Sequence, residues 1–215
     1  MTPTETSNCN GSAMTSFAAS GGSGARSNYK TVLADPPWKM DLQGGNYSKT
    51  RNKRPKRLPY QTMSIAEVCA LPVGQMADDG CHLWLWTANQ YLRQGFDVMD
   101  AWGFKYLAPI TWVKPSGLGH WFIHRTQTIL FGYKGRCEFP LERYLPNVFE
   151  APAGRHSAKP EKSYDLIERV SPGPRLELFA RERRLGWSAW GNEVASDVTL
   201  VTPNASDQRP ATKTP

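Results

Sequence analysis

The chain has 215 residues, of which 40% are hydrophobic, and it carries a formal net charge of +7. This length predicts one domain with a substantial core. The longest apolar run is too short to span a bilayer, so no membrane association is expected. The four cysteines lack the paired spacing of zinc sites, so no metal is expected either. Without a disulfide framework or a signal peptide, the expected location is the cytoplasm.

Composition divides the chain into three segments. Residues 1–27 are rich in Ser, Gly, Thr and Ala and predict a disordered leader. Residues 194–215 drift into Thr, Pro, Asn and Ser and predict a flexible tail. The folded domain is therefore expected over residues 28–193.

The domain begins with a strand, a loop and a helix. A β-rich run at Tyr29–Ala34 predicts a strand that ends before two prolines. Residues 39–59 are basic and polar and predict a loop. Ser64, with Glu67 three residues later, is typical of a capping box and predicts a helix that ends near Leu71.

Strands and helices continue to alternate through the middle of the domain. The apolar run Cys81–Thr87 predicts a buried strand. Asn89 is expected to cap a helix with apolar residues at three- and four-residue spacing, and Gly103 is expected to end it. Two further strands are predicted at Lys105–Val113 and Gln127–Lys134.

The last part of the domain completes an α/β pattern. Pro160 fits the first turn of a helix that runs to about Val170. Strands are predicted at Leu176–Arg181 and Gly186–Trp190. This alternation indicates a largely parallel sheet, in which ligands bind at the carboxyl ends of the strands. Both the proline pair after the first strand and Arg181 are therefore expected at that edge.

The sequence Asp35-Pro36-Pro37-Trp38 is the strongest candidate for chemistry. Two prolines make a stiff loop, with an acceptor carboxylate before them and a large flat ring after them. Such a loop suits a planar group with an exocyclic amine, which would donate to Asp35 and to the Pro36 carbonyl while Trp38 stacks on its ring. Two acceptors out of line localise the nitrogen lone pair for attack on a methyl group. The alternative is a tight turn with an incidental aspartate.

Two segments are candidates for nucleic-acid contact. Six cations crowd residues 49–57, where the alternative is an ordinary solvated loop. The segment 117–125 combines aromatic and basic side chains, which either stack on bases or pack within the protein. The predicted contacts are Lys49, Arg51, Lys53, Arg54, Lys56 and Arg57 in the first segment and Trp121, His124 and Arg125 in the second.

Several short motifs, in a shared order, extend from residue 29 to residue 193. They are Tyr29–Trp38, Tyr60–Ser64, Leu83–Thr87, Ala101–Lys105, Thr111–Lys114, Lys159–Glu161, Glu177–Arg181 and Gly191–Glu193. In these motifs and their order the chain resembles the MT-A/Ime-type adenine-N6 methyltransferase family, which has eukaryotic mRNA-modifying and bacterial or phage DNA-modifying members.

The resemblance implies a Rossmann-like fold that binds S-adenosyl-L-methionine, with the catalytic loop before the cofactor-binding half (the permuted, β-class order). It assigns residues 28–193 to the methyltransferase domain and catalysis to Asp35, Pro36, Pro37 and Trp38. It also implies that Asp35 touches the methionine end of the cofactor and that Lys159 pairs with the methionine carboxylate. The remaining cofactor contacts that it implies are Glu177, Arg181, Asn192 and Glu193. For the predicted strand Leu176–Arg181, the alternative is a structural ion pair between Glu177 and Arg181.

Two positions depart from the family pattern. Ala158 stands where the family often has histidine, and Gln127 stands where an acidic residue is common. Both bear on substrate fit rather than on methyl transfer.

The expected function is methyl transfer from S-adenosyl-L-methionine to the N6 amine of adenine in nucleic acid, by a monomer or homodimer. DNA is favoured over RNA because the chain reads as a minimal catalytic domain. The alternatives are an RNA adenine-N6 methyltransferase, a non-catalytic family member that binds nucleic acid, and a methyltransferase for a small-molecule or protein amide.

Overall fold

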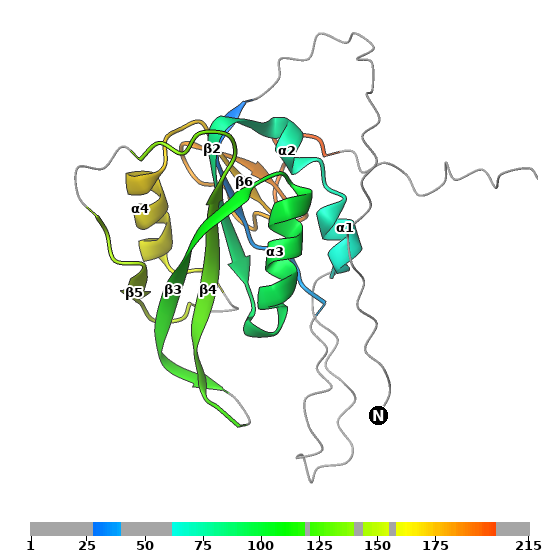
Figure 1. Cartoon of the computed structure of the whole chain (residues 1–215). Helices are drawn as coiled ribbons and strands as arrows, with labels where there is room; N and C mark the ends of the chain where they lie inside the picture. Colours follow the sequence, from blue (N-terminus) through cyan, green and yellow to red (C-terminus); the bar gives the residue numbers. More distant parts are fainter. Residues whose placement is uncertain (1–27, 40–61, 119–120, 140–143, 155–157, 201–215) are drawn as a thin grey trace, which may run out of the picture.

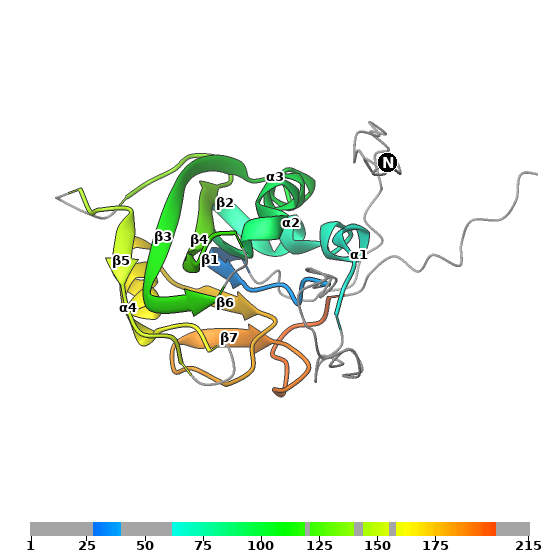
Figure 2. The same cartoon turned by 90° about the horizontal axis from the view of Figure 1, so that it is seen from below.

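The computed structural model describes residues 28–39, 62–118, 121–139, 144–154 and 158–200. Its centre is a seven-stranded sheet with three helices on one face, α1 (Ile65–Cys69), α2 (Val73–Met76) and α3 (Leu92–Ala101), and α4 (Glu161–Val170) on the other (Figures 1 and 2). The strand order is β5-β3-β4-β2-β1-β6-β7. The strands are β1 (Tyr29–Ala34), β2 (Ala77–Thr87), β3 (Lys105–Leu118), β4 (His124–Tyr133), β5 (Val148–Glu150), β6 (Arg175–Leu178) and β7 (Trp187–Trp190).

The sheet is mixed but mostly parallel. Four of its six neighbouring pairs are parallel, and only β4 runs against its neighbours β2 and β3. The carboxyl ends of β1, β2, β6 and β7 therefore meet at one edge. The predicted α/β class with a largely parallel sheet is confirmed.

Both faces of the sheet are buried, which explains the unbroken apolar run in β2. Side chains alternate along a strand, so Leu83 and Leu85 face the helices α1 to α3, whereas Trp84 and Trp86 face α4. Leu33 of β1 joins the second group. Two separate apolar layers hold the sheet rigid.

Helix α1 starts where predicted, whereas α3 and α4 start at other residues than predicted. Helix α1 (Ile65–Cys69) has the predicted capping box, in which the Ser64 hydroxyl oxygen accepts from the Glu67 N–H at 3.2 Å and the Glu67 carboxylate accepts from the Ser64 N–H at 2.7 Å. The pattern did not reveal α2 (Val73–Met76). Helix α4 (Glu161–Val170) has Pro160 as its N-cap, one residue before the first turn.

Helix α3 (Leu92–Ala101) begins later than predicted. Asn89 does not cap it, because Asn89–Tyr91 form a separate 3-10 turn and the Asn89 amide lies 3.1 Å from His124 Nδ1. The predicted stop at Gly103 is confirmed, since this glycine has a φ of +78°.

Strands β3 and β4 are longer than predicted and form a hairpin arm, defined here as residues 114–118 and 121–125. Figure 1 shows it reaching beyond the other strands. Most of the segment that was expected to join two strands is thus itself strand. Strand β6, in contrast, ends at Leu178 rather than Arg181, because Phe179 adopts a left-handed φ of +63° and leaves the sheet.

Part of the predicted tail packs on the domain. Val198 and Leu200 contact the core layer under α1 to α3. The Asp197 carboxylate accepts from the Ala189 N–H at 2.8 Å and from the Arg183 guanidinium at 2.8 Å. The leader (1–27) and residues 201–215 lie outside the described residues.

Ser171, directly after α4, ties this helix to β2. Its hydroxyl oxygen accepts from Trp84 Nε1 at 2.9 Å and lies 2.8 Å from His82 Nδ1. All three side chains are buried, and burial lowers the pKa of His82. This hydroxyl therefore satisfies two polar groups that have lost their contact with water.

We expect Ser171→Ala to lower the free energy of unfolding by about 1–3 kcal/mol, because a buried Trp84 N–H loses its acceptor. Exposed Ser116 of the hairpin arm offers a control, whose alanine variant should change stability by less than about 0.5 kcal/mol. Urea unfolding measures both. Equal stability of the two variants would contradict the bridging role of Ser171.

Candidate active site

The carboxyl edge of the sheet surrounds a cavity of about 1020 Å³. Its lining includes the Asp35–Trp38 loop after β1, Ala88–Gln90 after β2, the segment after β6, and Gly191–Glu193 after β7. Residues at the start of α1 and before α4 complete it: Thr62, Met63, Glu67, Ala153, Gly154, Ala158 and Lys159. The base of the hairpin arm closes another side. The predicted catalytic loop and Arg181 thus lie on the same cavity, as expected for this edge.

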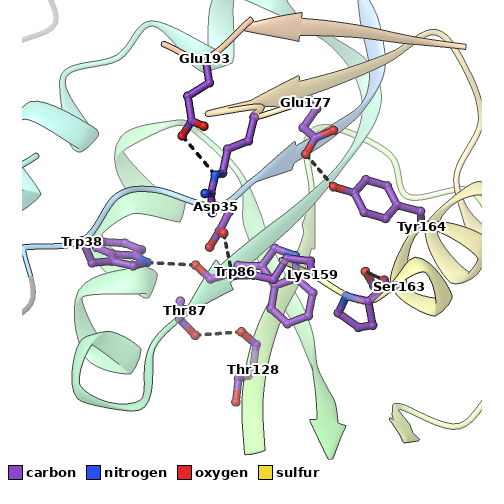
Figure 3. Close-up of polar contacts among 12 residues, drawn as sticks. Asp35, Trp38, Trp86, Thr87, Thr128, Lys159, Ser163, Tyr164, Glu177 and Glu193 are labelled. Atoms are coloured by element: carbon purple, nitrogen blue, oxygen red, sulfur yellow. Dashed lines mark hydrogen bonds and ion pairs between the residues drawn. The ribbon is translucent and has the colours of Figure 1, made fainter. Parts of the chain in front are cut away.

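Asp35 and Lys159 form the closest ion pair of the cavity. Lys159 Nζ lies 2.6 Å from Asp35 Oδ2, with 12% and 37% of the two side chains exposed (Figure 3). The same ammonium group lies 5.0 Å from the ring centroid of Trp86. Lys159 immediately precedes α4, where the positive end of the helix disfavours a cation, and Asp35 offsets that cost.

The proline loop is anchored on both sides. The Pro36 carbonyl accepts from the Trp38 N–H at 2.8 Å, and the Pro37 carbonyl accepts from the Met63 N–H at 3.0 Å. Trp38 Nε1 donates to the Trp86 carbonyl at 3.2 Å. These bonds fix the Asp35 carboxylate relative to the sheet, and the Pro36 oxygen keeps a second lone pair.

The Trp38 ring is more enclosed than a free stacking surface. It is 5% exposed and stacks on Tyr91, with ring centroids 5.3 Å apart and planes inclined by 15°. It nevertheless lines the cavity. Stacking of Trp38 on a bound base stays a prediction, while its anchoring of the loop is visible in the contacts.

The opposite wall comes from the loops after β6 and β7. Arg181 Nε lies 3.1 Å from a Glu193 oxygen, and both side chains are about half exposed. A Cβ on Gly191 would lie 2.1 Å from the Ala180 carbonyl oxygen, so only glycine permits this approach of the two loops. Phe179, with its left-handed backbone, also lines this wall.

Glu177 lies behind this wall and not in the lining of the cavity. Its carboxylate accepts from the Tyr164 hydroxyl at 2.7 Å (Figure 3). Burial raises the pKa of Glu177, and the hydrogen bond from Tyr164 opposes that rise. Arg184 lies 3.7 Å from the Tyr164 ring centroid and pairs with Glu161 of α4. A direct contact of Glu177 with the cofactor stays a prediction.

The structure places only one of the two predicted nucleic-acid segments. The six basic residues between 49 and 57 lie outside the described residues. In the second segment, Trp121 is 86% exposed near the end of the hairpin arm, and His124 lines the cavity. Arg125 Nε donates to the Lys114 carbonyl at 2.9 Å. This segment therefore extends from the cavity into solvent.

Lys114 is a cavity residue that the sequence did not single out as functional. The signal was its spacing, because residues two apart on a strand share a face and Trp112 is deeply buried. Among the described residues, no group of three or more His, Cys, Asp or Glu side chains is placed to hold a metal ion. None of the helices in the described ranges is long and apolar enough to cross a membrane.

The raised pKa of Glu177 predicts a pH-dependent stability. The folded state binds this proton more tightly than the unfolded chain, so ionised Glu177 lowers stability above its folded-state pKa. Glu177→Gln removes the charge and keeps an oxygen for Tyr164. We expect the variant to be more stable than wild type at pH 8, with an advantage that shrinks as the pH falls through the folded-state pKa.

Urea unfolding at several pH values measures this difference. Glu138→Gln, at an exposed carboxylate that pairs with Arg136, controls for the loss of one negative charge. A Glu177→Gln variant that is equally destabilised at every pH would show that the charge is needed for folding.

Comparison with known proteins identifies the family. The MT-A70 family model matches residues 29–193, which include every described strand. The chain is 33% identical over 193 residues to the "N(6)-adenosine-methyltransferase MT-A70-like protein" of Drosophila melanogaster, covering 84% of this chain and 29% of that protein. It is 30% identical over 188 residues to the human N(6)-adenosine-methyltransferase catalytic subunit METTL3, covering 82% and 30%. The chain is also 29% identical over 200 residues to the type II methyltransferase M.MunI of Mycoplasma sp, covering 85% of this chain and 85% of that protein.

The chain therefore spans about 30% of the Drosophila and human relatives but most of the Mycoplasma one. The match confirms the predicted family and its methyltransferase fold. The chain belongs to the MT-A70 family of S-adenosylmethionine-dependent N6-adenosine methyltransferases.

Proposed function

We propose that this protein transfers a methyl group from S-adenosyl-L-methionine to the N6 amine of adenine in nucleic acid, with DNA as the favoured substrate. The observation that carries the proposal is the rigid Asp35–Pro36 acceptor pair at the edge of a large cavity, with Lys159 held against it. Family membership supports the same chemistry.

The acceptor pair explains how a weak nucleophile is activated. The Asp35 carboxylate and the Pro36 carbonyl oxygen each accept a hydrogen bond from one N–H of the amine. This pair of hydrogen bonds favours a tetrahedral nitrogen with a localised lone pair. The anchored loop holds both acceptors before substrate arrives, so little reorganisation is required. No strong general base is needed, because the methylated amine is acidic enough to lose its proton to an ordinary acceptor.

The residues around the cavity fit the cofactor. When bound, S-adenosylmethionine supplies an electrophilic methyl group on a sulfonium. Lys159 is a largely buried cation in the lining and suits the methionine carboxylate. Arg181, Asn192 and Glu193 offer polar groups for a ribose and an adenine on the opposite wall. We propose these residues as the cofactor contacts.

The hairpin arm supports nucleic acid as the substrate. It exposes Trp121 and Phe122, whose rings can stack on bases, and it carries Arg125 beside the cavity. DNA is favoured because the type II methyltransferase of Mycoplasma sp matches this chain over 85% of the length of both proteins. RNA remains the second candidate, since the chain is also 30% identical to the METTL3 subunit.

Labelled S-adenosylmethionine tests the proposal directly. The protein is incubated with single-stranded DNA, duplex DNA or RNA, each of random sequence, and the digested products are analysed for N6-methyladenine. We expect the modified base in DNA at higher yield than in RNA. We expect Asp35→Asn, which keeps the size of the side chain but loses its charge, to lower kcat by more than about a hundred-fold.

Asp100→Asn, at an exposed position of α3, is the matched control and should keep wild-type turnover. A folded Asp35→Asn variant that retains more than about a tenth of wild-type kcat would contradict the role of Asp35. That residual rate corresponds to less than about 1.4 kcal/mol of the barrier, which is too small for the group that orients the nucleophile.

A further inference from the structure

Lys114 is a half-buried cation on the acceptor side of the cavity. It lies on β3 two residues after Trp112, and its ammonium group is 4.6 Å from the centroid of that ring. Burial lowers the pKa of Lys114, and the charge of Lys159 lowers it further. Burial and the nearby positive charge thus both disfavour the ammonium form of Lys114. An anion beside Lys114 would stabilise that form.

The described residues that line the cavity do not provide this anion. Three of them are carboxylates, and each already has a partner: Asp35 pairs with Lys159, Glu193 with Arg181, and Glu67 accepts two hydrogen bonds from Ser64 at the start of α1. No carboxylate among the described residues lies within 4.0 Å of the Lys114 ammonium. Within the described ranges no carboxylate is left to neutralise Lys114, so its ammonium group is open to an anionic ligand.

Gln127, a neutral neighbour of Lys114, supplies no charge that would neutralise the ammonium group. It pairs with Trp112 across β3 and β4, so its side chain shares a face with Trp112 and Lys114. A carboxylate at position 127 would be a diagonal neighbour of Lys114, within reach of its long side chain. The amide that is present leaves the positive charge available.

We propose that Lys114 binds the phosphodiester next to the target adenine. This inference rests on the proposed function. Lys114, like Trp112, Gln127 and His124, comes from β3 or β4. Arg181 and Asn192 follow β6 and β7 at the other end of the sheet, and the proposed function assigns Lys159 to the methionine carboxylate. A nucleotide substrate brings one phosphate charge with each residue, and a lysine ammonium binds it as a point charge. The substrate is therefore a nucleotide within a strand rather than a free nucleobase.

A DNA strand that the wild-type protein methylates is the probe, and Lys114→Gln is the variant. We expect its dissociation constant to rise about ten-fold and the slope of log K against log salt to fall by about one, because one phosphate contact is lost. Gln127→Glu should weaken binding in the same direction. Lys105→Gln, an exposed position at the other end of β3, is the control for charge and should bind as wild type does.

Strands with one neutral methylphosphonate identify the contacted phosphate. At the phosphate beside the target adenine, the substitution should weaken the binding of the strand to wild type about ten-fold. It should leave the affinity of Lys114→Gln for the strand unchanged. Calorimetry should show equal S-adenosylmethionine affinity for wild type and Lys114→Gln. A loss of cofactor affinity in Lys114→Gln would overturn the inference, because the anion would then be the methionine carboxylate.

The two levels of the proposal fail in different ways. If wild type methylates DNA and Lys114→Gln binds the strand as tightly as Lys105→Gln does, only the phosphate contact is wrong. If wild type neither binds nor methylates any nucleic acid, the proposed function and the phosphate contact are both wrong.

Discussion

The ion pair between Asp35 and Lys159 is the contact on which the site depends. It joins the loop after β1 to the start of α4, which are 124 residues apart in the chain, at an N–O distance of 2.6 Å. Trp86 of β2 supports both partners, because its carbonyl accepts from Trp38 of the loop and its ring lies 5.0 Å from the Lys159 ammonium. One strand residue thus sets the relative position of the acceptor carboxylate and the cation.

Under the proposed function, Lys159 has two anionic partners, the Asp35 carboxylate and the methionine carboxylate of the cofactor. In the structure its ammonium group neutralises Asp35, which otherwise would be a lone carboxylate at the edge of a partly apolar cavity. In the proposed reaction Lys159 would hold the methionine carboxylate, which would leave Asp35 to accept hydrogen bonds from the target amine. Cofactor binding and preparation of the acceptor are then one event, and the sheet with its two apolar layers keeps the rest of the site fixed.

The sequence predicted the parts of the molecule that local chemistry decides. The capping box at Ser64, the strand before the two prolines and the stop at Gly103 all follow from single residues and short-range periodicity. Tertiary contacts decided the rest. Asn89 bonds to His124 instead of capping α3, and Phe179 ends β6 in a left-handed conformation that its residue type does not indicate. Within the site, spacing alone did not bring Lys159 to Asp35, and the role of Lys114 depends on a cross-strand register with Gln127 that only the folded sheet defines.

The exchange of Lys159 between two anions is tested most directly by calorimetry with two cofactors. S-adenosylmethionine carries the carboxylate, and its decarboxylated analogue keeps the sulfonium and the amine. We expect Lys159→Met to weaken binding of S-adenosylmethionine roughly ten- to hundred-fold, as for loss of a charge-assisted hydrogen bond, and to leave the affinity for the analogue close to that of wild type. Equal losses for both compounds, or no loss for either, would contradict the account, because Lys159 would then serve Asp35 alone.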